Sequence, residues 1–358
     1  MSTTTTRYFK STLLQIAGWV AAALLITLIR YTGLRTDVLA EGGTHRQVSL
    51  GYILLTSAIA GALVGLAYGV MDIFLDRPSF RQKPYGSLIL IQTAFHLGLL
   101  LVVVSLIFAW DVLKVEGRWS TSTWLQGITS GSTVMTLVYA TIVSFIFNFL
   151  KQINRKFGPG NLVKLLLGKY YHPREEGRVF MFLDLKSSTT HAERLGHIRY
   201  SRLIQDCFSD LAVVIKHQAE VYQYVGDEAV LCWATNRGLQ DLNCLKAYFV
   251  FDERLQARKH HYETQYGFVP EFKAGVNLGE VTVAEVGEIK REIAFHGDVL
   301  NTAARIQARC NEFGQRLLIS GYLKDALPEQ LPFTVEKMGN VQLRGRNQSV
   351  DVFAVEQT

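Results

Sequence analysis

The sequence has little cysteine and no clusters of it. Only 4 of its 358 residues are cysteines, and all four follow residue 150. None stands in a C-x-x-C pair or at a Cys/His spacing typical of a zinc site. We therefore expect no structural zinc, and a reducing, cytoplasmic environment for the part of the chain after residue 150.

The sequence also lacks a basic stripe with interleaved aromatic residues. Its 37 lysines and arginines exceed its 31 acidic residues and give a net charge of +6, but they are scattered. Many lie beside apolar segments, a pattern typical of membrane topology. We expect a lipid bilayer, and no nucleic acid, among the partners of this chain.

Long apolar runs are concentrated before residue 151. Four of them come near the roughly 20 residues that cross a bilayer as a helix: Leu13–Ile29, Tyr52–Phe74, Leu88–Trp110 and Val134–Leu150. They predict an N-terminal α-helical transmembrane bundle of four spans, residues 1–150.

Basic residues near the ends of these runs favour an N-terminus inside the cell. In that orientation the inner side carries Arg7, Lys10, Arg77, Arg81, Lys83, Lys151, Arg155 and Lys156, and the outer side carries Arg30, Arg35, Arg46, Lys114 and Arg118. An even number of spans returns the chain to the side on which it began. We expect an integral protein of a plasma or bacterial inner membrane, with the N-terminus and the C-terminal half both in the cytoplasm.

Few polar residues interrupt the apolar runs. The notable ones are Gln15, Gln92 and His96. A buried histidine is able to ligate haem or to sense protons, but a single histidine without an evident partner favours a hydrogen bond between helices. Gly61 and Gly65 form a G-x-x-x-G pair, which permits close helix contact.

After a connector at residues 151–177, which either transmits a change or serves as a spacer, the pattern becomes that of a mixed α/β domain, residues 178–358. It predicts strands at Arg178–Asp184, Glu220–Tyr224, Ala229–Trp233, Phe272–Leu278, Glu280–Ala284, Glu292–Phe295, Arg316–Ile319, Phe333–Lys337 and Val350–Val355. It predicts helices at Thr190–Ala219, Leu239–Lys259, Val299–Asn311 and Tyr322–Ala326. The opening β-α-β-β-α-β order is typical of a ferredoxin-like α+β sheet with helices on one face.

Two acidic residues lie where predicted strands end or turn. Asp184 ends the first run, and Asp227 lies in the glycine-containing turn of a predicted hairpin, Val221–Trp233. If these strands are neighbours, both carboxylates project from one edge of the sheet. Two carboxylates so placed predict a Mg²⁺ site that substrate phosphates complete.

Ser187, Ser188 and Thr189 open the helix that follows Asp184. Serine and threonine are favoured helix caps, and a helix N-terminus presents free N–H groups to phosphate. Taken alone, this turn is simply a capped helix. Together with the two acids, it suits a triphosphate with bound Mg²⁺.

Asn301 and Arg305 stand four residues apart on a predicted helix and therefore share one face. An amide and a guanidinium together can hold a ribose oxygen and the charge that develops on a transferring phosphoryl group. In isolation, a turn hydrogen bond and a surface ion pair are the simpler interpretation. Arg344, at a basic loop tip, is suited to a polyphosphate.

These residues carry a resemblance to a known family. F-L-D-L-K-S-S-T at Phe182–Thr189 and V-G-D-E at Val225–Glu228 resemble the two metal motifs of class III nucleotide cyclases, the family of adenylyl and guanylyl cyclases. F-K-A-G-V-N-L-G at Phe272–Gly279 resembles its central strand, H-G-D-V-L-N-T-A-A-R at His296–Arg305 its transition-state helix, and L-R-G at Leu343–Gly345 its terminal L-K-G. The motifs keep the family's order over about half of the chain, and the apolar half is not covered.

The resemblance implies a role for each residue. Asp184 and Asp227, with the backbone carbonyl of Leu185, would hold two Mg²⁺ ions, for which Mn²⁺ is able to substitute. Asn301 would orient the ribose, and Arg305 would stabilise the α-phosphate as pyrophosphate leaves. In the family, the metal pair and the Asn/Arg pair come from opposite subunits, so a homodimer is implied.

Base choice in the family depends largely on two positions, which here hold Gln223 and Ala294. Gln223 both donates and accepts hydrogen bonds, and the side chain of Ala294 does neither. ATP is favoured on family frequency alone, which implies an adenylate cyclase that makes 3′,5′-cyclic AMP and pyrophosphate; GTP or a pyrimidine triphosphate stays open. Arg344 stands where the family has a lysine on the triphosphate, and its guanidinium has a different geometry.

Two other functions compete with this one. An inactive cyclase-like module for nucleotide binding or dimerisation is disfavoured by the presence of Asp184, Asp227, Asn301 and Arg305. A diguanylate cyclase is disfavoured because its hairpin carries G-G-D/E-E-F, whereas this turn reads V-G-D-E.

Overall fold

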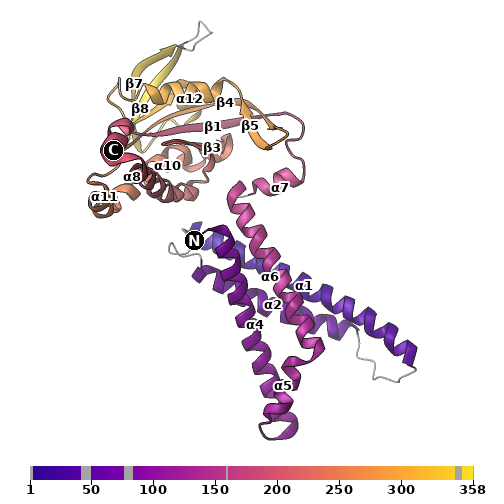
Figure 1. Cartoon of the computed structure of the whole chain (residues 1–358). Helices are drawn as coiled ribbons and strands as arrows, with labels where there is room; N and C mark the ends of the chain where they lie inside the picture. The colour runs from indigo at the N-terminus through magenta and orange to yellow at the C-terminus, as the bar shows by residue number, and fades with distance from the viewer. Residues whose placement is uncertain (1–2, 42–49, 76–83, 159, 343–348, 358) are drawn as a thin grey trace. The chain divides into compact units, whose positions relative to one another are not determined.

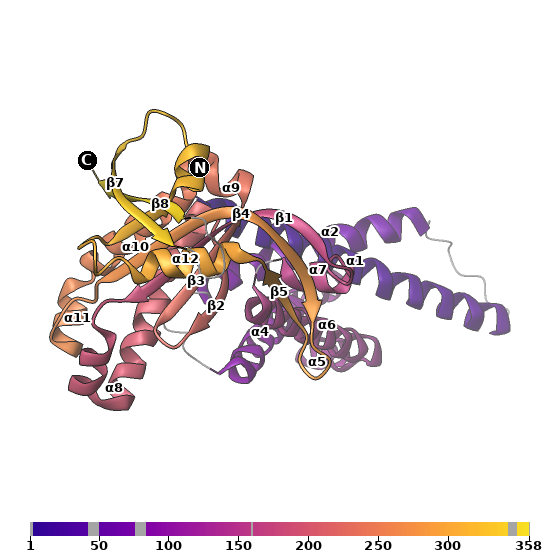
Figure 2. The same cartoon turned by 90° about the horizontal axis from the view of Figure 1, so that it is seen from above.

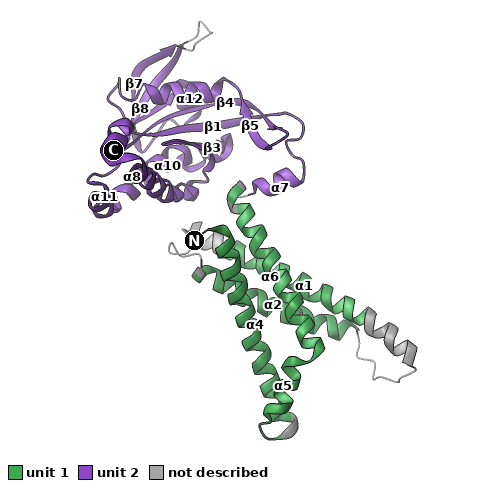
Figure 3. Cartoon of the chain, in the orientation of Figure 1, with its two compact units in different colours: residues 1–156 green, residues 157–358 purple. Residues whose placement is uncertain are grey.

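The computed structural model describes residues 3–41, 50–75, 84–158, 160–342 and 349–357. The chain divides into two compact units, residues 1–156 and residues 157–358 (Figure 3). We call them the helical unit and the sheet unit, and each is described by itself.

The described residues of the helical unit form α1 (Thr3–Glu41), α2 (Leu50–Leu75), α4 (Tyr85–Glu116), α5 (Thr121–Thr129) and α6 (Gly131–Phe157) (Figure 1). Four of these helices are long and apolar enough to cross a membrane, over Ser11–Tyr31, Leu50–Phe74, Tyr85–Lys114 and Gly131–Asn154. The four predicted apolar helices are therefore confirmed in length and composition. The short helix α5, which the sequence did not predict, begins at Ser120, whose hydroxyl accepts from the backbone N–H of Thr123.

Glycines in α2 let it lie directly against the backbone of α1. A Cβ atom at Gly61 would lie 2.7 Å from the carbonyl oxygen of Trp19, and one at Gly65 would lie 2.6 Å from the Cα of Ile16. Larger residues at either position would push the helices apart. The G-x-x-x-G pair thus makes the close helix contact that the sequence predicted.

The sheet unit is built on an eight-stranded sheet. Its strands are β1 (Arg174–Leu185), β2 (Glu220–Val225), β3 (Glu228–Ala234), β4 (Phe272–Val286), β5 (Glu292–His296), β6 (Leu317–Ser320), β7 (Phe333–Gln342) and β8 (Ser349–Gln357). The order is β2-β3-β1-β4-β6-β8-β7, and β5 pairs with β4. The first four strands lie in the order β2-β3-β1-β4 with antiparallel neighbours, which is the ferredoxin-like arrangement.

Different helices cover the two faces of this sheet. The helices and short turns are α7 (Asn161–Leu166), α8 (Ser188–Asp210), α9 (Thr235–Leu239), α10 (Asn243–Ala257), α11 (Lys259–Tyr266), α12 (Asp298–Ala308) and α13 (Gly321–Ala326), with 3₁₀ turns at Leu211–His217 and Gln240–Leu242. Alternate β1 residues such as Met181 pack with α8 and α10, whereas Phe180 packs with Ala303 of α12. Figure 1 shows α12 on one side of β1 and β3 and α10 on the other, and Figure 2 shows α12 lying across the sheet. The helices of the opening unit share one face, as predicted, and α12 covers the opposite face.

The first predicted helix of this unit is broken in two places. The predicted segment Thr190–Ala219 consists of α8 followed by the 3₁₀ turn Leu211–His217. Gly196, with a φ of +69°, interrupts α8 itself, a conformation that glycine adopts readily. The break changes the direction of the helix after its first turns.

β4 is one strand where the sequence predicted two, Phe272–Leu278 and Glu280–Ala284. Gly279 does not form a turn between them, because it pairs with Arg178 of β1. Because β4 is long, it pairs with every residue of β1. It also pairs with β6 near its own start and with β5 near its own end.

α12 approaches β4 most closely at Gly275. A Cβ atom there would lie 2.2 Å from the backbone nitrogen of Gln307 and 2.5 Å from the carbonyl oxygen of Ala303. Both are backbone atoms, so neither could move aside without the helix. Glycine at this position therefore sets the height at which α12 lies above the sheet.

We expect Gly275→Ala to destabilise the protein by about 1–3 kcal/mol, because the added methyl group would displace α12 from β4. Denaturant unfolding of the full chain would measure this. The matched control is Gly321→Ala, whose Cβ would meet its nearest neighbours at ordinary distances of 3.4–3.8 Å. Equal stability of the two variants would contradict the close approach.

Candidate functional site

Asp184 and Asp227 lie at the same edge of three adjacent strands. β2 and β3 form the predicted hairpin, with Val225 opposite Glu228 and with Gly226 at a φ of +62° in the turn. β3 pairs antiparallel with β1, which sets Asp184 opposite Glu228. Asp227 directly precedes Glu228, so the strand neighbourhood that the sequence pattern required is present.

Two side chains hold the carboxylate of Asp184. Gln307 of α12 donates from Nε2 to Oδ2 of Asp184 at 3.1 Å, and Nζ of Lys273 on β4 lies 3.3 Å from the same oxygen. Burial raises the pKa of Asp184, and the charge of Asp227 raises it further, whereas Lys273 and Gln307 oppose the shift without reversing it. The two aspartates therefore repel one another, and a divalent cation would relieve this repulsion.

Asp227 has an unsatisfied carboxylate oxygen. Its Oδ2 is buried and has no hydrogen-bond partner among the described residues, an arrangement that is unfavourable unless something binds the oxygen. Burial, and then the charges of Asp184 and Asp227, raise the pKa of Glu228.

The donor atoms of the two aspartates are of the kind that binds Mg²⁺. No three His, Cys, Asp or Glu side chains gather into a metal site within the part of the chain that the structure describes. Mg²⁺, however, needs only one or two carboxylates, because waters and substrate phosphates complete its coordination. The pair Asp184 and Asp227, with one buried oxygen left unpaired, fits this ion.

The chain leaves β1 through a strained turn. Leu185 is buried in the core at the end of β1, and Ser187 has a φ of +58°, which is uncommon for serine. Ser187 occupies the N-cap position of α8 but makes no side-chain capping hydrogen bond, although serine is a favoured cap. Ser188 is half-buried and Thr189 is exposed. The first N–H groups of α8 have no partner within the helix.

Asn301 and Arg305 lie one helical turn apart on α12, on a different face from Gln307. Asn301 is exposed and Arg305 is half-buried, whereas the buried residues of this helix are Thr302, Ala303, Ile306 and Gln307. Nη1 of Arg305 is buried without a hydrogen-bond partner among the described residues. The contact of α12 with Asp184 is made by Gln307, and no hydrogen bond or ion pair in the described chain joins Asn301 or Arg305 to the two aspartates.

Aromatic packing holds together the strands that carry Gln223 and Ala294. Gln223 is exposed on β2, and Ala294 is half-buried on β5. Their neighbours Tyr222 and Phe295 pack edge to face, with ring centroids 4.9 Å apart. The structure thus brings together the two strands to which base recognition was assigned. Arg344 lies outside the described residues.

Sequence reasoning missed three residues beside the aspartates: Lys273, Gln307 and Tyr200. Burial, and then Asp227, raise the pKa of the Tyr200 hydroxyl to about 12. Lys273 lies within the central-strand motif, and Gln307 follows the helix motif closely, so their positions carried a signal. Tyr200 carried none, because the break at Gly196 decides where the second part of α8 points.

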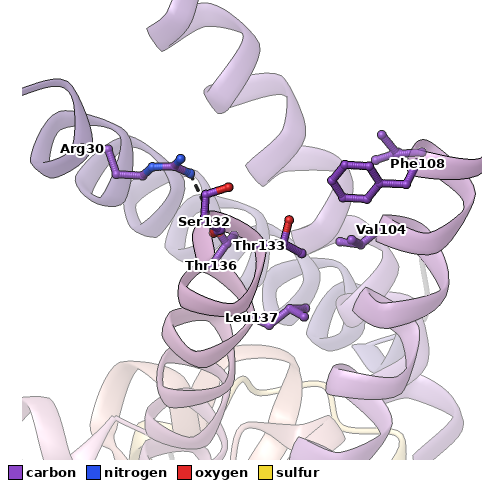
Figure 4. A pocket seen from close by; sticks show the side chains of 8 residues that line it. Arg30, Val104, Phe108, Ser132, Thr133, Thr136 and Leu137 are labelled. Atoms are coloured by element: carbon purple, nitrogen blue, oxygen red, sulfur yellow. Dashed lines mark hydrogen bonds between the residues drawn. The ribbon is translucent and has the colours of Figure 1, made fainter. Parts of the chain in front are cut away.

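The helical unit contains a cavity of about 160 Å³ (Figure 4). Arg30 of α1 points toward Thr136 of α6, with 3.5 Å between its Nη1 and the threonine hydroxyl. The other lining residues are Val104, Ile107, Phe108, Ser132, Thr133 and Leu137. None of the site residues predicted from the sequence lines this cavity.

Comparison with known proteins identifies relatives of this chain. Residues 170–357 match the model of the adenylate and guanylate cyclase catalytic domain family. The chain is similar to adenylate cyclase 2 of Rhizobium meliloti (strain 1021), with 33% identity over 220 residues, or 61% of each protein. It is also similar to adenylate cyclase 1 of the same organism, with 24% identity over 183 residues, or 49% of this chain and 27% of that protein. The matches thus span less than two thirds of either relative.

A solved structure shows the same fold. The structure of a bacterial light-regulated adenylyl cyclase resembles this chain with a TM-score of 0.53 and 17% identity, over 64% of this chain and 68% of that one.

We expect Asp227→Asn to lower the pKa of Asp184, because one of the two influences that raise it disappears. Lys273→Met should raise the same pKa, since a cation beside the carboxylate is lost. Carboxyl-carbon NMR titration of aspartate-labelled full chain, without divalent cations, would measure both. Shifts of the same sign in the two variants would be incompatible with this geometry.

Proposed function

We propose, from the premise that this chain belongs to the adenylate and guanylate cyclase family, that it converts a nucleoside triphosphate to a 3′,5′-cyclic nucleotide and pyrophosphate. Membership of the family rests on the match over residues 170–357, more than half of the chain. The reaction forms a bond from the ribose 3′-oxygen to the α-phosphorus and breaks the bond from that phosphorus to pyrophosphate. The hydroxyl proton passes to solvent.

The observation that carries this proposal is the aspartate pair. Asp184 and Asp227 share one sheet edge, the pKa of Asp184 is raised, and Oδ2 of Asp227 is buried without a partner among the described residues. Two Mg²⁺ ions, or Mn²⁺, held by this pair and by the carbonyl oxygen of Leu185, would activate the 3′-hydroxyl and neutralise the triphosphate. Lys273, which holds Asp184, adds a positive charge beside them.

The turn from Ser187 to Thr189 is assigned to the phosphates. Its backbone enters α8 without a side-chain cap, so the N–H groups of the first helical turn are available to an anion. The serine and threonine hydroxyls add further donors. The turn begins only three residues after Asp184, so phosphates bound at the turn would lie close to the aspartate pair.

Arg305 is assigned to the charge that develops on the α-phosphate. A half-buried guanidinium with an unpartnered nitrogen is unfavourable by itself and is a ready site for a phosphoryl oxygen. Asn301 lies one helical turn earlier on the same face and is assigned to the ribose.

A homodimer follows from these assignments. Asn301 and Arg305 make no hydrogen bond or ion pair to Asp184 or Asp227 within the described chain, and they lie on a different face of α12 from Gln307. A second copy of the chain would bring its Asn/Arg pair to the aspartates of the first. Each dimer would then contain two equivalent shared sites.

ATP is the favoured substrate, because both relatives described above are named adenylate cyclases. Gln223 and Ala294 do not force this choice. The amide of Gln223 is exposed and both donates and accepts, while the methyl group of Ala294 discriminates only by shape. GTP and the pyrimidine triphosphates are therefore separate outcomes of the test.

The helical unit is assigned to a membrane. Its four long apolar helices satisfy the length and composition of membrane spans, and basic residues favour a cytoplasmic N-terminus. The sheet unit then lies in the cytoplasm, where nucleoside triphosphates and Mg²⁺ are available.

The test is turnover of purified full-length protein with ATP, GTP, CTP and UTP separately, in Mg²⁺ and in Mn²⁺. We expect a cyclic product from one nucleotide, and Asp227→Ala to lower the rate by about 10²–10³-fold or more while the dimer persists. Asp325→Ala, an exposed aspartate on α13, is the control and should leave the rate unchanged. No product from any nucleotide, with Mn²⁺ present and dimers verified, would favour a nucleotide-binding or dimerisation module instead.

The shared site predicts complementation between two inactive variants. We expect a mixture of Asp184→Ala and Asn301→Ala chains to recover about a quarter of wild-type activity, because half of randomly assorted dimers are mixed and each has one intact site of two. Activity assays after co-expression would measure this. A mixture as inactive as its parents, with mixed dimers demonstrated, would exclude an intersubunit site.

A further inference from the structure

The helical unit contains a buried polar cluster that the proposed reaction does not use. Each of the four long helices contributes a residue: Gln15 of α1, Asp72 of α2, His96 of α4 and Lys151 of α6. The side chain of Asp72 is 5% exposed and that of His96 is 1% exposed. All four lie within candidate membrane spans, where ionisable residues are rare and mark functional sites.

One oxygen of Asp72 is satisfied and the other is not. Oδ2 accepts from Nε2 of Gln15 at 3.0 Å and lies 2.9 Å from Nζ of Lys151. Oδ1 lies 3.9 Å from Nε2 of His96, and neither atom has a hydrogen-bond partner among the described residues. Two buried, unpartnered atoms are thus separated by a gap about 1 Å too long for a hydrogen bond.

The ring of His96 is held in place from its other edge and from its face. Its Nδ1 lies 2.7 Å from Oγ of Ser144 on α6, which is the helix–helix hydrogen bond that the sequence favoured. Tyr68 stacks on the ring, with centroids 4.0 Å apart, and its hydroxyl donates to the carbonyl oxygen of His96. The ring cannot turn away, so Nε2 stays directed to the side of Asp72.

In the part of the chain that the structure describes, few ionisable groups surround the pair formed by His96 and Asp72. The described ionisable groups that face His96 are Asp72 and Tyr68 of α2 and Lys151 of α6; α1 contributes only the uncharged Gln15 and Trp19. Asp72 and Lys151 together carry no net charge. A proton on His96 would therefore add one positive charge directly beside Oδ1 of Asp72 and would supply the missing hydrogen bond.

We propose that His96 and Asp72 form a proton-binding site in the helical unit, and that its occupancy changes the rate of the cyclase. In the tautomer in which Nδ1 donates to Ser144, Nε2 of the neutral ring has a free lone pair; a proton bound there would donate to Oδ1 and draw α4 toward α2. The change reaches α6 at two points, because Ser144 holds His96 and Lys151 holds Asp72. A further hydrogen bond joins the same two helices, because Asn148 of α6 donates to the hydroxyl of Thr93 on α4.

The chain itself provides the route from α6 to the aspartate pair. α6 ends at Phe157, and α7 begins at Asn161. Within the sheet unit, Nζ of Lys164 on α7 lies 3.5 Å from a carboxylate oxygen of Glu220, the first residue of β2. β2 runs directly into the turn that carries Asp227. Under this proposal, a shift of α6 would reach the sheet unit through this connection, at the strand that leads to Asp227.

The experiment compares pH profiles of the full-length protein in lipid nanodiscs, from pH 5 to 8.5. His96→Gln keeps a polar side chain in reach of Ser144 but binds no proton. We expect the ratio of wild-type to His96→Gln activity to change about fivefold or more across this range, because only the wild-type side chain is able to bind a proton. His197→Gln, which removes an exposed histidine of α8, is the control and should keep the wild-type profile. A constant ratio would overturn the proposal.

A second variant keeps the test decisive if His96→Gln does not fold. In Lys151→Gln the charge of Asp72 is no longer shared, so the inflection should move to higher pH; an unmoved inflection would overturn the proposal. The thermal midpoint of the same proteins against pH repeats both comparisons without turnover. Midpoints that respond to His96 in a chain without cyclase activity would uphold the proton site and reject only the proposed reaction.

Discussion

The antiparallel pairing of β1 with β3 is the contact on which the rest of the sheet unit depends. It sets Asp184 opposite Glu228 and thereby places Asp227, at the tip of a hairpin, beside the end of β1. A slip of one residue would turn one carboxylate to the other face. The two carboxylates repel one another, and this repulsion is partly offset because Lys273 of β4 and Gln307 of α12 both contact Asp184.

The closeness of α12 to the sheet determines which of its side chains reach the aspartates of the same chain. The absence of a side chain at Gly275 lets the helix backbone reach β4, and this brings Gln307 to Asp184 of the same chain. Asn301 and Arg305 lie on another face of the helix, where Asn301 is exposed and Arg305 is half-buried. In the proposed dimer, the same helix would support the aspartates of its own chain and offer a cation to those of a second copy.

Among the buried polar atoms that have no hydrogen-bond partner in the described residues, those of Asp227, Asp72 and His96 belong to ionisable groups that face another ionisable group. Oδ2 of Asp227 lies at the sheet edge, and the gap between Asp72 and His96 lies inside the helical unit. Stability alone would favour apolar residues at such positions. Their presence is consistent with the two proposals made above, a divalent cation at the first site and a proton at the second.

Features that depend on short stretches of chain could be predicted from the sequence. Run length predicted the four apolar helices and the glycine turn predicted the hairpin, because each of these signals spans at most about 25 residues. Motif order, which extends over about half of the chain, predicted the fold. Which distant side chains meet depends on the tertiary fold. Tyr200 reaches Asp227 because Gly196 breaks α8, and His96 meets Asp72 because four helices pack together. Such contacts join residues that no local pattern relates, so folding alone brings them within reach of one another.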